Sequence, residues 1–151
     1  MKLSAHFSLA EFLSPNDPNR PSHAALANLR ALAAVLEVLR ARANRPLKIT
    51  SGYRSPSYNR AIGGAAMSLH TTGMACDIEA PGDMLELAAL ASQITEIGGV
   101  GVYPGRGFIH VDIRRRPENA KAPTWWAQVA GAYGAVPKDL VTRIRKAGGS
   151  I

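Results

Sequence analysis

Ser68-Leu69-His70-Thr71-Thr72-Gly73-Met74-Ala75-Cys76-Asp77-Ile78 is the stretch around which the chain is organised. It places His70 and Asp77 seven positions apart, with Gly73 between them. Residues 74–79 alternate as a strand does, with apolar side chains on one face and Asp77 on the other. We therefore expect Asp77 to project from a rigid strand and His70 to lie on the loop that enters it. Gly73 would permit the bend between them.

A second predicted strand covers residues 108–113, and its polar side chains also share one face. His110 and Asp112 stand on that face, whereas the alternate positions are apolar. His110 together with His70 and Asp77 would make a three-ligand zinc site. Three is the number of protein ligands at a catalytic zinc, which keeps its fourth position for water.

The length and composition are those of one globular domain, with 151 residues of which 46% are hydrophobic. No apolar run approaches the roughly 20 residues that a membrane helix needs, so we expect no membrane partner. We recognise no secretory signal before Glu11, which predicts synthesis in the cytoplasm. The single cysteine, Cys76, excludes an internal disulfide, and its strand position predicts a small buried side chain.

The net charge of +7 is concentrated near the end of the chain. From Ile113 onward, eight basic residues face two acidic ones. Such a segment suits an anionic polymer, which could be nucleic acid, an acidic membrane surface or a bacterial cell wall. The alternative is a solvated basic surface that aids solubility. Nucleic acid is the least expected partner, because no aromatic residues alternate with the basic ones apart from Trp125-Trp126.

Periodicity and capping signals predict a mixture of helices and short strands. The strands over 100–103 and 108–113 are separated by a tight turn and should pair as a hairpin. An α+β fold follows, with a small antiparallel sheet flanked by helices. We assign residues 1–116 to the domain and residues 117–151 to a basic C-terminal extension packed on it or trailing it. The remaining predicted strands are 47–51 and 74–79, and the predicted helices are 7–13, 22–44, 57–62, 83–97 and 137–146.

Several motifs occur in an order that resembles a known family. They are Ser51-Gly52-Tyr53-Arg54-Ser55-Pro56, Asn59, Gly63-Gly64, Ser68-x-His70-x-x-Gly73-x-Ala75-x-Asp77-Ile78 and Phe108-Ile109-His110-Val111-Asp112. Together they resemble the zinc D-alanyl-D-alanine carboxypeptidase-like peptidases. That family includes enzymes that cut the stem peptides of peptidoglycan, and it shares its fold with the hedgehog signalling domain.

The resemblance implies Zn²⁺ bound by His70, Asp77 and His110, with each ligand type suited to that metal. Zinc would activate water and polarise the scissile carbonyl of a peptidoglycan stem peptide. Arg54 resembles the family's arginine that steadies a carbonyl or carboxylate of the substrate. Its alternative role is a salt bridge that holds the turn.

The chain departs from the best-known members at the catalytic base. Many members carry an acidic residue three or six positions before the last zinc histidine, where this chain has Gly107 and Pro104. Asp112 is the substitute we consider, because two residues along a strand place it about 7 Å from His110 on the same face. Asp112 could equally be a hydrogen-bond partner that orients His110. Glu79, on the face of Asp77, is a poorer candidate.

The expected function is therefore a zinc peptidase of the carboxypeptidase or endopeptidase (endolysin-like) type, which acts at the cell wall and could come from a phage or prophage. The alternative is a zinc-stabilised cell-wall-binding module without turnover, which the missing acid would allow. An open fourth zinc position within reach of Asp112 would favour the enzyme, and a fourth protein ligand would favour the module.

Overall fold

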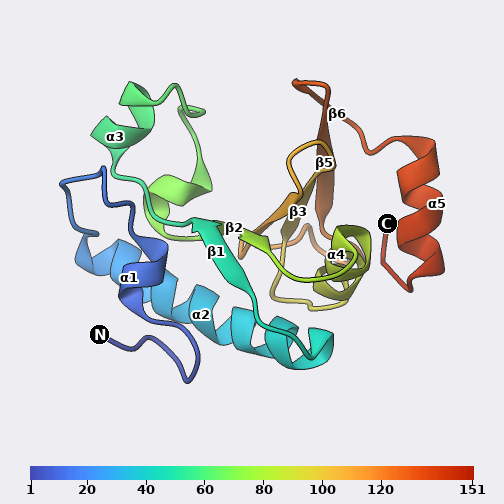
Figure 1. Cartoon of the computed structure of the whole chain (residues 1–151), viewed down its shortest axis with the longest axis horizontal. Helices are drawn as coiled ribbons and strands as arrows, with labels where there is room; N and C mark the ends of the chain where they lie inside the picture. Colours follow the sequence, from blue (N-terminus) through green and yellow to red (C-terminus); the bar gives the residue numbers. More distant parts are fainter.

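The computed structural model describes the whole chain, residues 1–151, and is built on one six-stranded sheet of order β1-β2-β4-β3-β5-β6 (Figure 1). Neighbouring strands are antiparallel except β3 and β5, which run parallel. Helices accompany the sheet, so the predicted α+β class is confirmed. The strands are β1 (Lys48–Ser51), β2 (Ala75–Glu79), β3 (Gly99–Tyr103), β4 (Phe108–Asp112), β5 (Thr124–Val129) and β6 (Ala132–Gly134).

The long helix α2 supplies most of one side of the core. It begins after Ser22, whose side chain accepts a hydrogen bond from the backbone of Ala25, as its place before the apolar stripe predicts. Its apolar stripe from Ala25 to Leu39 is buried. The other helices are α1 (Leu9–Phe12), α3 (Pro56–Ala61), α4 (Met84–Ser92) and α5 (Lys138–Lys146), beside α2 (His23–Ala43) and the 3₁₀ helix η1 (Leu69–Thr72).

Helix α4 ends at Ser92, five residues before the predicted end at Ile97. The guanidinium of Arg116 explains this early end. It donates hydrogen bonds to the carbonyl oxygens of Ser92, Ile94 and Ile97 at 2.8–2.9 Å. Because these carbonyls are satisfied by a side chain, the segment folds into turns rather than continuing the helix.

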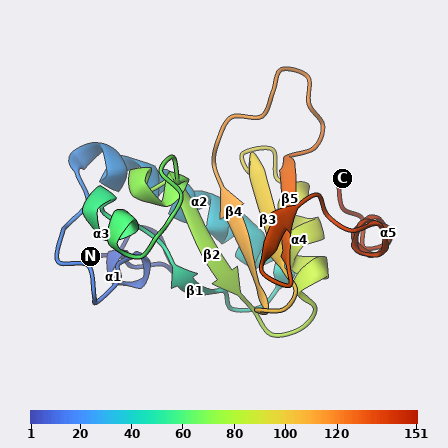
Figure 2. The same cartoon turned by 90° about the horizontal axis from the view of Figure 1, so that it is seen from above.

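The two faces of the sheet have different roles. One face packs its apolar side chains into the core that α2 and α4 complete, and Figure 2 shows α2 passing behind the sheet. The other face carries Asp77 of β2 and His110 of β4, which are direct cross-strand neighbours. The core residues of the central strands are Cys76, Ile78, Val100, Val102, Ile109 and Val111.

The C-terminal extension continues the same sheet. A long loop follows β4 and returns the chain to β5, which lies beside β3 (Figure 2). Helix α5 buries Leu140 and Ile144 and contacts α4. The indole Nε1 of Trp125 donates to the carbonyl of Ser150 at 2.8 Å, which fixes the end of the chain. None of the helices has the length and apolar character needed to cross a bilayer.

Candidate metal centre and its cleft

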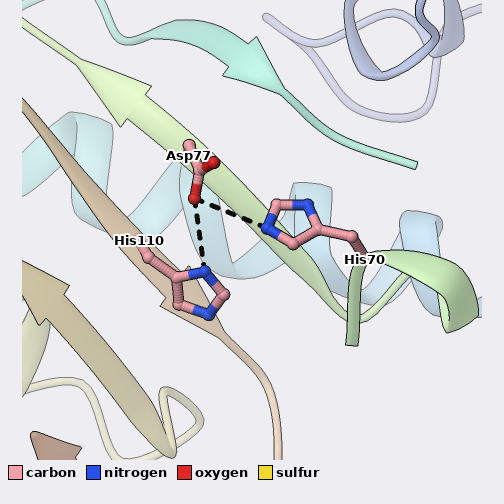
Figure 3. A group of neighbouring side chains, drawn as sticks. All are labelled: His70, Asp77 and His110. Carbon is pink, nitrogen blue, oxygen red and sulfur yellow. Dashed lines mark ion pairs between the residues drawn. The ribbon is translucent and has the colours of Figure 1, made fainter. Parts of the chain in front are cut away.

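Three buried side chains converge on one point above the sheet. His70 Nε2 lies 3.5 Å and His110 Nδ1 lies 3.2 Å from the same oxygen, Oδ1 of Asp77 (Figure 3). The candidate ligand atoms of all three residues lie within 4.8 Å of one another. The fold thus brings together the two histidines and the aspartate that the sequence singles out.

Local structure places each member of this group. Ser68 caps η1, and Gly73 ends it with a φ of 76°, a conformation that favours glycine. A Cβ at Gly73 would stand 2.5 Å from the carbonyl oxygen of Ala25, so the turn lies tightly against α2. His70 is consequently fixed at the entry to β2, on the side from which it can face Asp77.

Each imidazole is held by a hydrogen bond on its far nitrogen. His70 Nδ1 lies 2.7 Å from the carbonyl oxygen of Gly52, which can only accept, so Nδ1 carries the proton. His110 Nε2 lies 2.8 Å from Oδ2 of Asp112. These partners leave His70 Nε2 and His110 Nδ1 to present their lone pairs toward Asp77, as metal-binding histidines do.

The distances from Asp77 to the two imidazoles suit a metal ion. Asp77 Oδ1 is buried and has no hydrogen-bond partner. His110 Nδ1 is close to it but lacks hydrogen-bond geometry, so proximity alone does not satisfy the oxygen. Ligand atoms about 2.0–2.1 Å from a tetrahedral zinc are separated by about 3.4 Å. The two separations that include Asp77, 3.2 and 3.5 Å, agree with that value, and all three ligand atoms lie within 4.8 Å of one another. A cation there would satisfy an oxygen that otherwise stays unpaired.

The charges of Asp77 and His110 influence each other's pKa values. Burial opposes the ionised form of Asp77, but the two neighbouring imidazoles outweigh this effect and lower the pKa of its carboxyl. Burial likewise opposes the cationic form of His110, yet the hydrogen bond with Asp112 and the nearby carboxylate of Asp77 raise its pKa. The site therefore attracts a positive charge, which a proton or a metal ion can supply.

Asp112 lies behind His110 and does not line the cleft. Its side chain is fully buried. Oδ2 accepts from His110 and from Arg114 Nη2 at 2.7 Å, and Oδ1 accepts from Arg114 Nε at 2.8 Å and from its backbone at 3.2 Å. Although burial raises the pKa of Asp112, these hydrogen bonds lower it to about 2. The imidazole of His110 thus stands between this carboxylate and the point where the ligand atoms converge.

Arg54 lies beside Asp77, whereas Asp112 lies beside His110. Its Nη2 is 3.9 Å from Asp77 Oδ2, and hydrogen bonds with Ser51 and Asn59 anchor the guanidinium at 3.2 and 3.4 Å. The backbone of Arg54 donates to the carbonyl oxygen of His70 at 3.1 Å, which ties the Ser51–Pro56 turn to η1. Both hydrogen-bond anchors are neutral, so Asp77 is the charged group that partly offsets the positive charge that Arg54 presents to the cleft.

The group opens into a cleft of about 1350 Å³. His70, Asp77 and His110 line it together with Arg54, and Glu79 also reaches it. Aromatic residues that the sequence does not single out as site residues form another wall: Tyr103, Phe108, Trp126 and Tyr133. Tyr103 and Phe108 pair within the β3–β4 hairpin, whereas the positions of Trp126 and Tyr133 depend on the parallel pairing of β3 with β5, which no local pattern reveals. One signal was present, since Gly99 and Gly101 alternate with valines and leave room on this face of β3.

Tyr103 is the most enclosed of these aromatic residues. Burial and the neighbouring Tyr133 raise the pKa of its phenol to about 12, although the hydrogen bond from Trp126 lowers it. The hydroxyl therefore keeps its proton at neutral pH and can donate a hydrogen bond within the cleft.

Comparison with known proteins agrees with this geometry. A family model described as Peptidase M15 matches residues 5–112. The peptidoglycan L,D-endopeptidase MepK of Escherichia coli (strain K12) is 38% identical over 73 residues, which are 45% of this chain and 40% of MepK. The probable peptidoglycan L,D-endopeptidase MepK of Haemophilus influenzae is 36% identical over 74 residues, 46% of this chain and 40% of that protein. The match thus spans about 40% of the length of these curated relatives.

Proposed function

Because the chain belongs to the peptidase M15 family, we propose that it is a zinc-dependent peptidase that hydrolyses peptide bonds of bacterial peptidoglycan. One observation carries the proposal. Asp77 presents a buried, unpaired oxygen to two oriented histidines at the floor of an open cleft. A site that served only to stabilise the fold would be closed by a fourth protein ligand, and no further histidine, cysteine or carboxylate joins this group.

In this proposal Zn²⁺ is held by His70 Nε2, Asp77 Oδ1 and His110 Nδ1. Bound there, zinc would activate a water molecule and polarise the scissile carbonyl. The Gly52 carbonyl and Asp112 hold the two imidazoles in the required orientation. We assign the role of orienting His110 to Asp112, because its carboxylate is buried, is paired with His110 and Arg114, and does not line the cleft.

Arg54 binds the substrate next to the scissile bond. Its planar guanidinium suits a carbonyl or carboxylate oxygen of the substrate, and its neutral anchors keep it aimed at the cleft. Its backbone contact with His70 couples the position of the substrate to that of the metal ligand. A substrate held by Arg54 would therefore lie across the group formed by His70, Asp77 and His110.

Transfer of a proton from the attacking water requires an acceptor in the cleft. Asp112 lacks access to it, whereas Glu79 lines it. Glu79 shares the strand face of Asp77 and lies two residues away, about 7 Å along β2. Many family members carry an acidic residue at the position of Gly107. Because Ile78 pairs with Ile109, Glu79 lies near the end of β4 that adjoins Gly107. We assign proton acceptance to Glu79.

The names of the relatives suggest which bond to test first. Both matched relatives are named as L,D-endopeptidases of peptidoglycan. We propose an L,D peptide bond of the stem or cross-link as the substrate of this chain. The basic residues of α5 would further favour an anionic wall polymer, because Arg143, Arg145 and Lys146 are exposed on its last turn.

Digestion of purified peptidoglycan sacculi tests the proposal. The protein is incubated with sacculi with and without a chelator, and the released fragments are identified by mass spectrometry. New amine termini that vanish with chelator and return with added zinc are expected, and their masses identify the bond. The His110→Ala variant is the matched control. Fragment release that is unaffected by chelator and by this substitution would overturn the proposal.

A further inference from the structure

We propose that the strand pair β5–β6, which lies outside the family-matched region, completes the active site. Trp126 of β5 is a positioning residue that holds the ring of His110, and Tyr133 of β6 contacts the substrate. This inference rests on the proposed function. It adds that residues after 112, which the sequence presents as a basic extension, contribute a wall of the cleft.

Trp126 packs directly on His110, with their ring centroids 4.8 Å apart and their planes inclined by 58°. The guanidinium of Arg114 lies over the indole, 5.3 Å from its ring centroid, and makes a cation–π contact with it. The indole Nε1 donates to the hydroxyl of Tyr103 at 3.4 Å. Trp126 is thus held by two partners while it closes the side of His110 that neither Asp77 nor Asp112 occupies.

The neighbouring strand is shaped to accept this indole. Gly101 of β3 pairs with His110 on one side and with Trp126 on the other. A Cβ at Gly101 would come within 2.5 Å of Nε1 and Cε2 of Trp126. Any larger side chain there would displace the ring, because real Cβ atoms do not approach so closely. Glycine at this position therefore lets the indole lie over β3 and reach His110.

Trp125 shows that this arrangement is specific to one face of β5. Successive side chains of a strand point to opposite faces, so the two neighbouring tryptophans have different surroundings. Trp125 packs against the apolar core and bonds to Ser150, whereas Trp126 lines the cleft. The chain thus contains a matched control for Trp126 in the adjacent residue.

Tyr133 extends the same wall toward solvent. Its ring makes an edge contact with Tyr103 at 6.2 Å between centroids, yet 67% of the residue is exposed. Such a large exposed ring on a cleft has apolar area to offer to a ligand, and its hydroxyl can hydrogen-bond. Phe108 and Arg106 continue this wall, with the guanidinium 5.1 Å from the ring centroid. An acidic peptide suits a wall that combines aromatic rings with an arginine.

Metal-dependent fluorescence tests the position of Trp126. The chain has two tryptophans, so Trp125→Phe leaves Trp126 as the sole emitter and Trp126→Phe leaves Trp125. Titration with Co²⁺, a paramagnetic quencher, should quench Trp125→Phe strongly at one equivalent and Trp126→Phe only slightly. Equal quenching of the two variants at one bound Co²⁺ would overturn this inference and leave the proposed function intact. If neither variant bound Co²⁺, the metal site itself would fail, and with it the proposed function.

Metal affinity and kinetics test the two roles separately. Trp126→Leu and Gly101→Ala should each weaken zinc binding about tenfold, the lower range for loss of a group that orients a ligand. Gly101→Ala retains Trp126 but displaces its ring, so the two variants perturb the same contact with His110 by different routes. Tyr133→Ala should raise KM several-fold with kcat and zinc affinity unchanged. Unchanged zinc affinity in the first two variants, or an unchanged KM in the third, would refute the corresponding role.

Discussion

His110 Nε2 and Asp112 Oδ2 are joined at 2.8 Å on the side of the imidazole that faces away from Asp77. The carboxylate is also paired with Arg114 through both of its oxygens. A group that is buried and fully paired cannot approach a water molecule in the cleft. We therefore propose that Asp112 contributes to the site by fixing the orientation and tautomer of His110.

Replacement of Asp112 by Asn should impair metal binding more than the chemical step. The amide keeps the shape of the carboxylate but removes the charge that holds His110 and Arg114. We expect zinc affinity to fall about 10–100-fold, with turnover near that of the parent once zinc is saturating. Competition with a zinc chelator and kcat at saturating zinc are the measurements. A collapse of kcat with intact affinity would instead identify Asp112 as the proton acceptor.

Replacement of Glu79 by Gln should have the opposite effect. Glu79 lines the cleft but is not one of the three converging ligands, so its loss should lower kcat by about 10²–10⁴-fold and leave zinc content unchanged. Glu118→Gln, in the exposed loop before β5, serves as the control for loss of one negative charge. Normal kcat in Glu79→Gln would remove Glu79 from the mechanism.

Replacement of Arg54 by Lys tests whether the planar guanidinium binds the substrate. Lysine keeps the positive charge but cannot bond to Ser51, Asn59 and a substrate oxygen in one plane. We expect kcat/KM to fall about 10–100-fold, which is the loss of one or two charge-assisted hydrogen bonds. Zinc affinity should not change. Wild-type kcat/KM in this variant would show that Arg54 only holds the turn.

Replacement of Gly73 by Ala should destabilise the fold and displace His70. The residue has a φ of 76°, and a Cβ would stand 2.5 Å from the carbonyl oxygen of Ala25. We expect the free energy of unfolding to fall by about 1–3 kcal/mol, measured by urea denaturation. Gly105→Ala is the matched control, because a Cβ there meets no atom within 4 Å. Equal stability of the two variants would contradict this account of the turn.

Local patterns in the sequence predicted much of the fold. The alternation of residues 74–79 predicted the buried Cys76 and the opposite placement of Asp77, and both are confirmed. The cap at Ser22 and the hairpin around Pro104 are also local, because the groups that form them are close in sequence. The end of α4 was predicted too late, since it depends on Arg116, a residue 24 positions beyond Ser92.

Contacts between distant segments limited what could be predicted about the site. The sequence pointed to His70, Asp77 and His110, and the register of β2 against β4 brings the last two together. It left two roles open for Asp112, because strand parity places a side chain on a face without showing what fills the space. Arg114 and Trp126 fill that space, and Trp126 arrives through a parallel pairing that has no signature in the sequence of β5.

Anomalous diffraction at the zinc absorption edge, from crystals grown with zinc, tests the central claim most directly. We predict one peak about 2.0–2.2 Å from His70 Nε2, Asp77 Oδ1 and His110 Nδ1. That peak should be absent from crystals of Asp77→Ala. A zinc ion bound elsewhere, with these three atoms left without it, would contradict the account.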